Sequence, residues 1–586
     1  MSLTDDQRVL VDADDSLFAV ACPGAGKTRV MVARFLKRTA EEERRGIALI
    51  SFTNAAVEEV RSRCGDQSKA LDVPHFVGTF DTFIHRFIVT PLYAREYKQK
   101  PNYVQSWREI ASTSFRLVPD LGRAKALEFD WFDFDPLGRS TLDLNRVPKD
   151  FGDAAAQQEL VRRRYAAEAQ VSHIFGRLLK AGTISCQAAR LLAECWLDSA
   201  KERSILTPLI RSRFAEVIVD EAQDCGQEEL RVLEFLRDCG VRIVMVGDID
   251  QSIYEFRNAT PTAVKEFAAS LPVPLELRDN WRSSPAICAF NGALRSGELV
   301  ETARGDNSII QTAVHVIEFS SLDQVVPAAL KAAEQYKLAA DDLMLLSHAE
   351  VHGMKAAGVV SPESAVSSRV LSLAHAGMKL RSRETDPKTR RKAVDQVQRA
   401  VLAALTVNHT LEHHSFDALC EKAGVEQRWL EAFAVRMAIS LDAEGKTRQA
   451  FAAEVRNFMR SADWGDVVPP SAGGLGKLFK APSDGLWAGV AGFGNSPTIR
   501  FSTVHGVKGK EFPGVVLVLP EKLRVDRVTD RTVLDDWEGG HDTEARRVLY
   551  VAGSRAQKLL MCAVHRKHVA RVGDLLDAKG VPYVRS

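Results

Sequence analysis

The segment LFAVACPGAGKTRV, residues 17–30, determines the fold class that we expect for this chain. Its first five residues are apolar and resemble a buried strand, and an apolar pattern of helical period begins after Thr28. Between them lies a glycine-rich turn. A strand, a glycine-rich loop and a helix in this order predict a phosphate-binding loop. Its candidate residues are Ala21, Gly24, Ala25, Gly26, Lys27 and Thr28, with Ala21 where such loops usually begin with glycine.

Each part of the predicted loop has a chemical role. Gly24 and Gly26 let backbone N–H groups turn inward around the phosphates, and the helix N-terminus adds partial positive charge. Lys27 neutralises phosphate oxygens, and the hydroxyl of Thr28 is a ligand for Mg²⁺. The alternative is a glycine-rich turn without a ligand. The strand before the turn and the helix after it are the context that a phosphate-binding loop requires.

An acidic segment, VIVDEAQD at 217–224, carries the second chemical signal. Four apolar residues end in Asp220 and Glu221, and a carboxylate at the end of a buried strand can hold Mg²⁺ opposite Thr28. We expect Asp220 to be the metal ligand and Glu221 to orient or deprotonate the attacking water. The alternative is that both acids only cap the next helix. A phosphate-binding loop in the same chain favours the metal site.

Strand-like apolar runs recur beside helical patterns in two parts of the chain. They lie at 46–52, 217–220, 241–248, 315–319, 343–347, 499–504 and 514–519. Strands followed by helices indicate parallel α/β sheets. Residues 91–213 and 351–494 lack such runs, and the first of these regions has Ala, Arg, Glu and Leu at helical spacing. We therefore expect two α/β cores, each interrupted by a mostly helical insertion.

The expected boundaries divide the chain into four parts. The first core comprises residues 1–90 and 208–275, and its insertion comprises residues 91–207. The second core comprises residues 276–350 and 495–586, around an insertion at 351–494. A nucleotide would lie in the cleft between the two cores.

Composition excludes several classes of protein. Of 586 residues, 45% are hydrophobic and 26% are charged, which excludes wholesale disorder. The 78 Lys and Arg residues against 77 Asp and Glu leave a net charge of +1, so a polyanion must bind in a local groove. No apolar run approaches a membrane span, the N-terminus lacks a signal-peptide pattern, and the nine cysteines form no C-x-x-C pair. We expect a cytoplasmic protein with no membrane partner.

Further motifs follow these two in order along the chain. They are VGDIDQSIYEFRNA (246–259), LRDNWRSSPAI (277–287), FSTVHGVKGKEF (501–512) and EARRVLYVAGSRAQKLL (544–560), preceded by LTDDQ (3–7), ALISFTNAAVEEV (48–60) and VGTFDTF (77–83). Together with VIVDEAQD they resemble the motifs of the UvrD/Rep/PcrA-like helicases of superfamily 1. The resemblance implies two RecA-like, parallel-sheet P-loop cores, each with a mostly helical insertion, that hydrolyse ATP with Mg²⁺.

The resemblance also assigns roles around the nucleotide. Gln7 matches the residue that pairs with adenine, and Trp281, where the family usually has Tyr, offers a flat face for the base to stack on. Arg282 and Arg555 match two arginine fingers, which stabilise the charge that develops on the γ-phosphate. The alternatives are a surface Gln, a buried core Trp and structural ion pairs of the two arginines.

Two more nucleotide contacts depend on the resemblance alone. Gln251 matches the residue that senses the γ-phosphate and links it to the DNA path. Glu511 matches a carboxylate that accepts a hydrogen bond from the ribose hydroxyl.

The expected path of a single strand is defined by aromatic and polar residues. Phe52, Tyr254 and Phe256 are candidates for stacking on bases, which gives grip without sequence preference, with core packing as the alternative. Thr79 and His505 would donate to phosphates, unless they only form local turn or cap hydrogen bonds.

Four positions depart from the family pattern. Asp81 stands where a His is common, Lys510 replaces an apolar residue, Ser554 replaces Thr, and His348 stands where an Arg often contacts DNA. None of these changes removes a group of the ATPase site. Because of them, the family pattern predicts the DNA contacts of this chain less directly than its nucleotide contacts.

The function implied by the resemblance is that of an ATP-dependent 3′-to-5′ DNA helicase or single-strand DNA translocase, acting on single strands and tailed duplexes. An alternative is an ATP-regulated DNA-binding subunit that serves a partner nuclease and unwinds little alone. The short chain and the GTFDTF segment, residues 78–83, also resemble the helicase-like subunit of Gabija-type anti-phage systems. A P-loop kinase or GTPase would have no counterparts of Gln251, Arg282 and Arg555.

Overall fold

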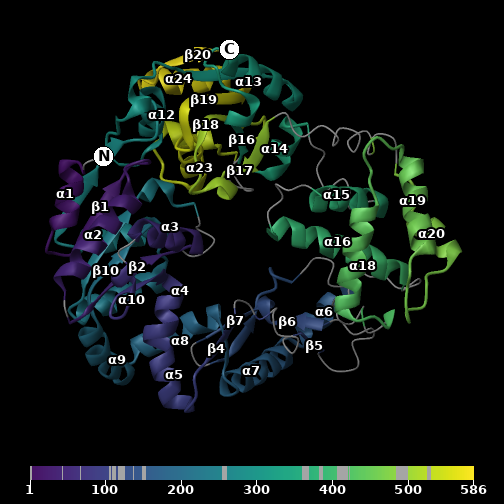
Figure 1. Ribbon diagram of the computed structural model, residues 1–586, viewed down its shortest axis with the longest axis horizontal. Helices are drawn as coiled ribbons and strands as arrows, with labels where there is room; N and C mark the ends of the chain where they lie inside the picture. Colours follow the sequence, from purple (N-terminus) through teal and green to yellow (C-terminus); the bar gives the residue numbers. More distant parts are fainter. Residues whose placement is uncertain are drawn as a thin grey trace.

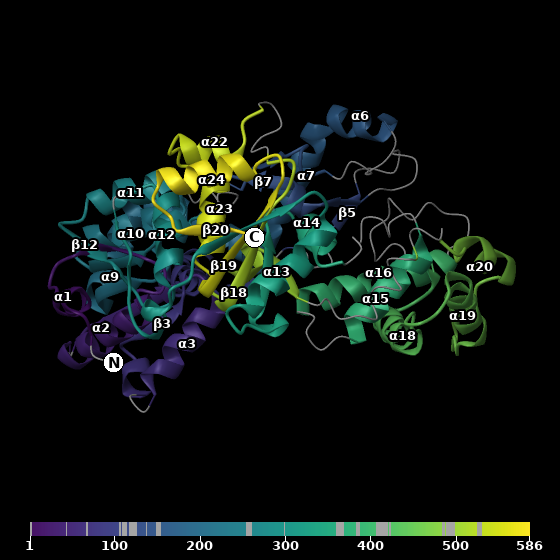
Figure 2. The same ribbon diagram turned by 90° about the horizontal axis from the view of Figure 1, so that it is seen from above.

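The computed structural model describes most of the chain. The described ranges are residues 3–42, 44–65, 68–104, 107, 114–116, 126–135, 138–147, 154–253, 261–297, 299–358, 368–381, 387–405, 420, 423–482, 487, 499–523 and 530–586. Figure 1 shows two sheets beside each other, with one insertion below the first sheet and the other to the right of the second. In the view from above, the second insertion projects to one side of both cores (Figure 2).

A six-stranded parallel sheet forms the centre of the first core. Its order is β12-β1-β11-β10-β2-β3. The strands are β1 (Leu17–Ala21), β2 (Gly46–Ser51), β3 (Phe76–Thr79), β10 (Phe214–Val219), β11 (Arg242–Gly247) and β12 (Val273–Leu277). Because neighbouring strands run parallel, the carboxyl ends of β1, β10 and β11 lie at one edge of the sheet. The loops that follow these ends carry the P-loop, the acidic pair and Gln251.

Helices on one face of this sheet present the P-loop. Helix α2 (Lys27–Glu41) starts directly after the loop, with Gly26 as its N-cap, and α1 (Asp5–Asp12) packs beside it. The side chain of Arg34 on α2 makes two hydrogen bonds, of 2.7 and 2.8 Å, to Glu216 on β10, and both side chains are fully buried. Arg34 also donates to the carbonyl of Leu10 at 2.5 Å. This bidentate pair fixes α2, and therefore the P-loop, on the sheet.

A second six-stranded parallel sheet forms the other core, in the order β17-β16-β18-β19-β15-β20. Its strands are β15 (Val314–Phe319), β16 (Leu343–Ser347), β17 (Arg500–Thr503), β18 (Phe512–Leu519), β19 (Ala556–His565) and β20 (Tyr583–Arg585). Helices α12 (Pro285–Leu294), α13 (Val325–Glu334), α23 (Glu544–Gly553) and α24 (Val569–Ala578) cover it. The two sheets confirm the predicted fold class of two parallel α/β cores.

The first insertion contains more strand than its sequence indicates. Its helices are α5 (Thr90–Tyr97), α6 (Ala154–Arg162), α7 (Arg164–Lys180), α8 (Cys186–Asp198) and α9 (Ala200–Arg213), with a π-helical turn at Ile84–Val89 before them. In the described part of this insertion, six strands of three residues, β4 to β9, pair as three two-stranded sheets between residues 102 and 185. The expectation of a segment without strands is therefore corrected. Three residues are too few to produce a period-2 pattern.

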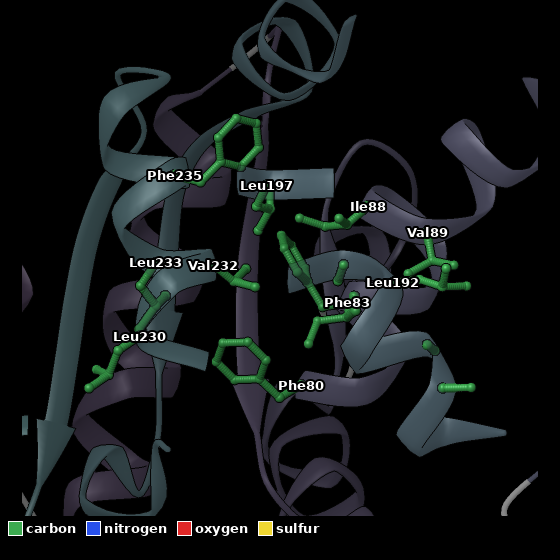
Figure 3. Packing of buried hydrophobic residues seen from close by; sticks show 14 of the residues in the cluster. Phe80, Phe83, Ile88, Val89, Leu192, Leu197, Leu230, Val232, Leu233 and Phe235 are labelled. Carbon is green, nitrogen blue, oxygen red and sulfur yellow. The ribbon is translucent and has the colours of Figure 1, made fainter. Parts of the chain in front are cut away.

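One continuous hydrophobic cluster joins this insertion to the first sheet. Figure 3 shows side chains from α4 (Phe80–Phe83), the π-helical turn, α8 and α10 (Gln227–Asp238) meeting in it. Phe83 is fully buried and its ring lies 5.4 Å from that of Phe214 at the start of β10. The insertion thus packs on the sheet through shared aromatic residues rather than through a linker.

The second insertion has a hydrophobic cluster of its own. Its described elements are helices: α14 (Glu350–Ala356) leads into it, followed by α15 (Arg369–Arg381), α16 (Pro387–Leu405), α18 (Gln427–Ser440), α19 (Arg448–Ser461) and α20 (Ala472–Leu478). Leu430, Phe433 and Phe451 are fully or almost fully buried in this cluster. Its core therefore does not depend on burial against either sheet.

Candidate nucleotide site between the two cores

A cleft of 740 Å³ lies between the two cores, and both contribute to its wall. Most predicted site residues line it: Gly24, Ala25, Gly26, Lys27, Thr28, Phe52, Asp220, Glu221, Gln251, Trp281, Arg282, Glu511 and Arg555. Gln7, Ala21, Thr79 and His505 do not line it. Tyr254 and Phe256 lie outside the described residues.

The P-loop touches the second core through its backbone. Gly24 and Gly26 have φ of 69° and 72°, the left-handed region that favours glycine. A side-chain carbon on Gly24 would lie 2.6 Å from Cβ of Arg282 and from Oδ1 of Asn280. The backbone N–H of Trp281 donates to the carbonyl of Gly24 at 3.1 Å. Glycine is therefore required at residue 24 both by its φ and by the approach of the second core.

The two acidic residues lie at the end of β10 in different environments. Asp220 is buried, and it accepts a hydrogen bond from the backbone N–H of Glu221 at 2.8 Å. Burial, and then the neighbouring charge of Glu221, raise the pKa of Asp220 to about 8. Burial would also raise the pKa of Glu221, but Lys27 and Lys508 outweigh it and lower that pKa below its usual value. Glu221 also has a left-handed φ of 52°.

The donor set fits a hard divalent cation. Thr28 and Asp220 both line the cleft, and Asp220 is a buried carboxylate at the end of β10. Oxygen ligands of this kind suit Mg²⁺, which usually binds one or two carboxylates together with substrate phosphates. The described residues contain no cluster of three or more His, Cys, Asp or Glu side chains that would hold a metal without such a ligand.

The two candidate fingers come from neighbouring positions in the second core. Glu511 and Arg555 directly precede β18 and β19, which pair in parallel with Phe512 opposite Ala556. Arg282 follows β13 (Asp279–Asn280), forms an ion pair of 2.5 Å with Glu511, and donates to the carbonyl of Ser554 at 3.0 Å. Arg282 thus has protein partners in this structure, as the ion-pair alternative anticipated.

Arg555 is the deepest cation of the cleft. Its Nη2 donates to Oε1 of Gln251 at 2.7 Å and to the hydroxyl of Ser554 at 2.9 Å. Burial, reinforced by the nearby charge of Arg282, lowers the pKa of Arg555 to about 9. A buried cation in this position is stabilised by an anionic partner, which a phosphate would supply.

The residues expected to contact the base and the ribose differ in burial and in hydrogen-bond partners. Gln7 is buried behind the P-loop, where its Nε2 donates to the carbonyl of Ala25 at 3.0 Å and its Oε1 accepts from the N–H of Thr4. Trp281 is half-buried at the cleft. Glu511 forms the ion pair with Arg282 and also accepts a hydrogen bond from Gln557 at 3.0 Å.

The described candidates for DNA contact make local interactions. Phe52 stacks on Phe80, with ring centroids 5.7 Å apart. The hydroxyl of Thr79 caps α4 by accepting from the N–H of Thr82 at 3.2 Å. A ring nitrogen of His505 lies 3.1 Å from the carbonyl oxygen of Ile253. These contacts match the packing and capping alternatives, and they leave the DNA roles untested.

Sequence reasoning missed the partners of several charged residues that the fold brings together. Lys508 forms a 2.6 Å ion pair with Asp224 of the first core, and both line the cleft. Both residues lie inside motifs that were identified in the sequence. Their charges within those motifs could have marked them as candidate site residues. Asp81 is bound at 2.7 Å by Arg190 from α8, and no sequence pattern connects these two residues. This ion pair explains the departure at Asp81, because a carboxylate can anchor the insertion there.

The fold and the cleft together define a class of protein, a P-loop nucleotide-binding protein with two parallel-sheet cores facing one site. Residues 3–272 match the family described as UvrD/REP helicase N-terminal domain, and residues 491–567 match the UvrD-like helicase C-terminal domain. The chain therefore belongs to the UvrD-like helicases, which confirms the resemblance of its motifs.

Two of the similar proteins are named as DNA helicases and a third as a Gabija protein. The chain is 29% identical to DNA helicase II of Escherichia coli over 305 residues, which cover 50% of this chain and 40% of that protein. It is 23% identical to the ATP-dependent DNA helicase Rep of Buchnera aphidicola over 345 residues, 56% of this chain and 47% of the relative. It is 22% identical to the Gabija protein GajB of Bacillus cereus over 257 residues, 44% and 41% of the two chains. The chain thus spans less than half the length of these relatives.

Proposed function

We propose that the protein is an ATP-dependent DNA helicase that couples ATP hydrolysis to 3′-to-5′ movement along single-stranded DNA. The observation that carries this proposal is the composition of the cleft. The first core contributes the P-loop and the acidic pair, and the second contributes Arg282 and Arg555. Arg555 already contacts Gln251 across the cleft at 2.7 Å. The printed names of the relatives support DNA as the substrate.

In this proposal the first core binds the triphosphate. Lys27 and the backbone around Gly24 and Gly26 hold the phosphates, while Thr28 and Asp220 hold Mg²⁺, which neutralises phosphate oxygens. The base stacks on Trp281. Gln7 can still pair with the base, because its amide has one N–H beyond the one given to Ala25. Glu511 would exchange a protein partner for the ribose hydroxyl.

Glu221 is the proposed general base. Its lowered pKa keeps it ionised at neutral pH, so that it can accept a proton from the attacking water. Arg282 would leave Glu511, and Arg282 and Arg555, the latter still held by Gln251, would neutralise the charge that develops on the γ-phosphate. Hydrolysis then depends on how the second core sits on the first.

We propose the path of the DNA from the motifs and from the short separation in sequence between Gln251 and the candidate stacking residues. Gln251 lies only a few residues before Tyr254 and Phe256, so a change at the phosphate reaches the strand over a short segment. Phe52, Thr79 and His505 complete the proposed contacts. We also propose the four-part division of the chain at residues 90, 207, 275, 350 and 494, with each core moving as a unit.

The test is strand displacement by the purified protein on 3′-tailed, 5′-tailed and blunt duplexes, with Glu221→Gln as the inactive control. We expect ATP-dependent unwinding of the 3′-tailed duplex only. Unwinding of the 5′-tailed duplex alone would reverse the proposed direction. No ATP hydrolysis in the presence of single-stranded DNA would contradict the proposed function altogether.

A second candidate function is that of a DNA-stimulated translocase that serves a nuclease and unwinds little alone. The similarity to the Gabija protein GajB favours it, as does a relative from Streptococcus thermophilus whose name describes an ATP-dependent helicase/nuclease. The same assay separates the two functions. DNA-stimulated ATP hydrolysis without displacement of any of the three duplexes supports the second candidate, and unwinding by the protein alone supports the first.

A further inference from the structure

A buried polar network crosses between the two cores beneath the nucleotide cleft. Its centre is Asp248, which follows β11 in the first core and is fully buried. Oδ1 of Asp248 accepts from Nη2 of Arg295 at 2.9 Å, and Oδ2 lies 2.8 Å from the hydroxyl of Tyr550. Both partners belong to the second core. The same Oδ2 accepts from Nε2 of Gln251 at 2.9 Å. One carboxylate therefore connects Gln251 to two residues of the opposite core.

Arg295 extends the network within the second core. It directly follows α12, its side chain is 1% exposed, and its Nη1 donates to Oε1 of Glu301 at 3.2 Å and to the hydroxyl of Tyr550. Its Nε lies 3.4 Å from Oδ2 of Asp250. The guanidinium carbon also lies 5.3 Å from the centroid of the Tyr550 ring. The planar fork of an arginine can serve these acceptors at once, which the single ammonium of lysine cannot do.

The far end of the network reaches the loop that carries Arg282. Oε2 of Glu301 accepts from Nδ2 of Asn280 at 2.8 Å. Oδ1 of Asn280 accepts from the backbone N–H groups of Arg282 and Ser283, at 2.9 and 3.0 Å. Gly24 of the P-loop packs against the same oxygen. A continuous buried path thus runs from Gln251, the partner of Arg555, to the backbone of Arg282 without entering the cleft.

We propose that Arg295 and Tyr550 are positioning residues for ATP hydrolysis, which hold Gln251 and the Arg282 loop in register across the two cores in the arrangement in which ATP is hydrolysed. This inference rests on the proposed ATPase function. Arg295 and Tyr550 do not line the cleft and have no contact with the nucleotide in the proposal. They act through Asp248 and Asn280, so their loss displaces both fingers from the γ-phosphate, while Lys27, Thr28 and Asp220 keep their positions in the first core.

The first test replaces only the hydroxyl, because removing Arg295 outright would leave buried carboxylates uncompensated and endanger folding. Tyr550→Phe keeps the buried ring. Arg295→Lys keeps the charge and loses the fork. The matched control is Tyr93→Phe, another fully buried tyrosine, whose hydroxyl donates to the carbonyl of Leu179 in the first insertion. A surface control is Arg304→Lys, whose ion-pair partner is Asp279.

The readout is the split between turnover and binding, measured well below the melting temperature of each variant. We expect Tyr550→Phe and Arg295→Lys to lower the DNA-stimulated kcat about tenfold, because small displacements of reacting groups have large effects on rate. The Kd for a fluorescent N-methylanthraniloyl-ATP with Mg²⁺ should change less than twofold. Both controls should leave kcat and Kd within twofold. Wild-type kcat in both network variants, or a Kd that weakens as much as kcat falls, would overturn the positioning role.

A second readout does not require activity. Amide hydrogen exchange in wild type and Tyr550→Phe should differ in two segments together, residues 249–252 and residues 280–284, with faster exchange in the variant. No difference in either segment would refute the network as a connection between the cores. Wild-type protein that does not hydrolyse ATP would defeat the proposed function, and the exchange measurement would then still decide whether the connection exists.

Discussion

The two walls of the cleft differ in charge and in chemistry. The wall from the first core has four carboxylates, those of Glu59, Asp220, Glu221 and Asp224, and three cations, Lys27, Arg29 and Arg63, together with the phosphate-binding backbone of the P-loop. The wall from the second core has four cations and one carboxylate, and its cations are Arg282, Lys508, Lys510 and Arg555. One wall can bind a triphosphate with a metal, and the other can only compensate its charge. Substitutions on the second wall should therefore lower hydrolysis without weakening binding, whereas the first wall holds residues for both.

The largest effect is expected from the second wall. Arg555→Ala should lower the DNA-stimulated rate of ATP hydrolysis by a factor of about 10² to 10³, because a finger residue acts on the transition state. The slow rate without DNA should change far less, since DNA that spans both cores favours the closed arrangement in which the finger acts. The measurement is ATP turnover with and without single-stranded DNA.

The control for this change is Arg566→Ala, an exposed arginine just after β19 in the same core. It should leave both rates at the wild-type level. An equal fold loss in Arg555→Ala with and without DNA would show that the finger does not depend on closure, and the difference between the two walls would then be one of charge only.

On the first wall, Glu221→Gln should lower ATP turnover by roughly 10² or more and leave Mg²⁺-ATP binding intact, because the general base is lost and the P-loop is unchanged. Lys27→Ala should lose both binding and turnover. Glu234→Gln, an exposed acid on α10, is the matched control. Wild-type turnover in Glu221→Gln would remove Glu221 from the proposed mechanism.

A smaller effect is expected for stability against pH at Glu301. Burial raises the pKa of Glu301 to about 7, above the ordinary 4.5, although Arg295, Asn280 and Asn291 oppose the shift and Asp248 adds to it. The folded state therefore binds more protons than the unfolded state between these two values, and this contribution to stability is lost as pH rises from about 4.5 through 7. Glu301→Gln mimics the protonated form.

Thermal unfolding of wild type and Glu301→Gln at several pH values checks this. The two proteins should melt together near pH 4, and the variant should become the more stable by roughly 3 kcal/mol above pH 7.5. A difference that is constant with pH would mean that Glu301 does not titrate in this window.

The smallest effect is expected from the ion pair that joins the two walls directly. Lys508 and Asp224 are about 10% exposed at the side chain, and their coupling in a double-mutant cycle of Lys508→Met and Asp224→Asn should be of the order of 1 kcal/mol. The measurement is the free energy of unfolding of the four proteins. A coupling of zero would indicate that the walls are held together by the buried network and not by this pair.

Local patterns were sufficient for the parts of the site that are contiguous in the chain. The strand, loop and helix around Lys27 and the acids at the end of β10 follow from residues within one or two turns of each other, because apolar runs and glycine positions restrict the local backbone. The strands of the first insertion were missed because each has only three residues. Phe134 and Phe175, whose rings stack on each other there, come from separate segments.

The sequence by itself therefore determined the two α/β cores, the P-loop, the acidic pair and the order of the family motifs. Only the tertiary structure decided which residues of different parts of the chain meet. The pairs Arg555 with Gln251, Asp248 with Arg295 and Asp81 with Arg190 are separated by 304, 47 and 109 residues. No local pattern specifies such a pair, because each ion pair or hydrogen bond forms only when independently folded elements bring their ends together. The sequence gives the position of each charged residue, but the packing of the tertiary structure determines which residue becomes the partner of a buried charge.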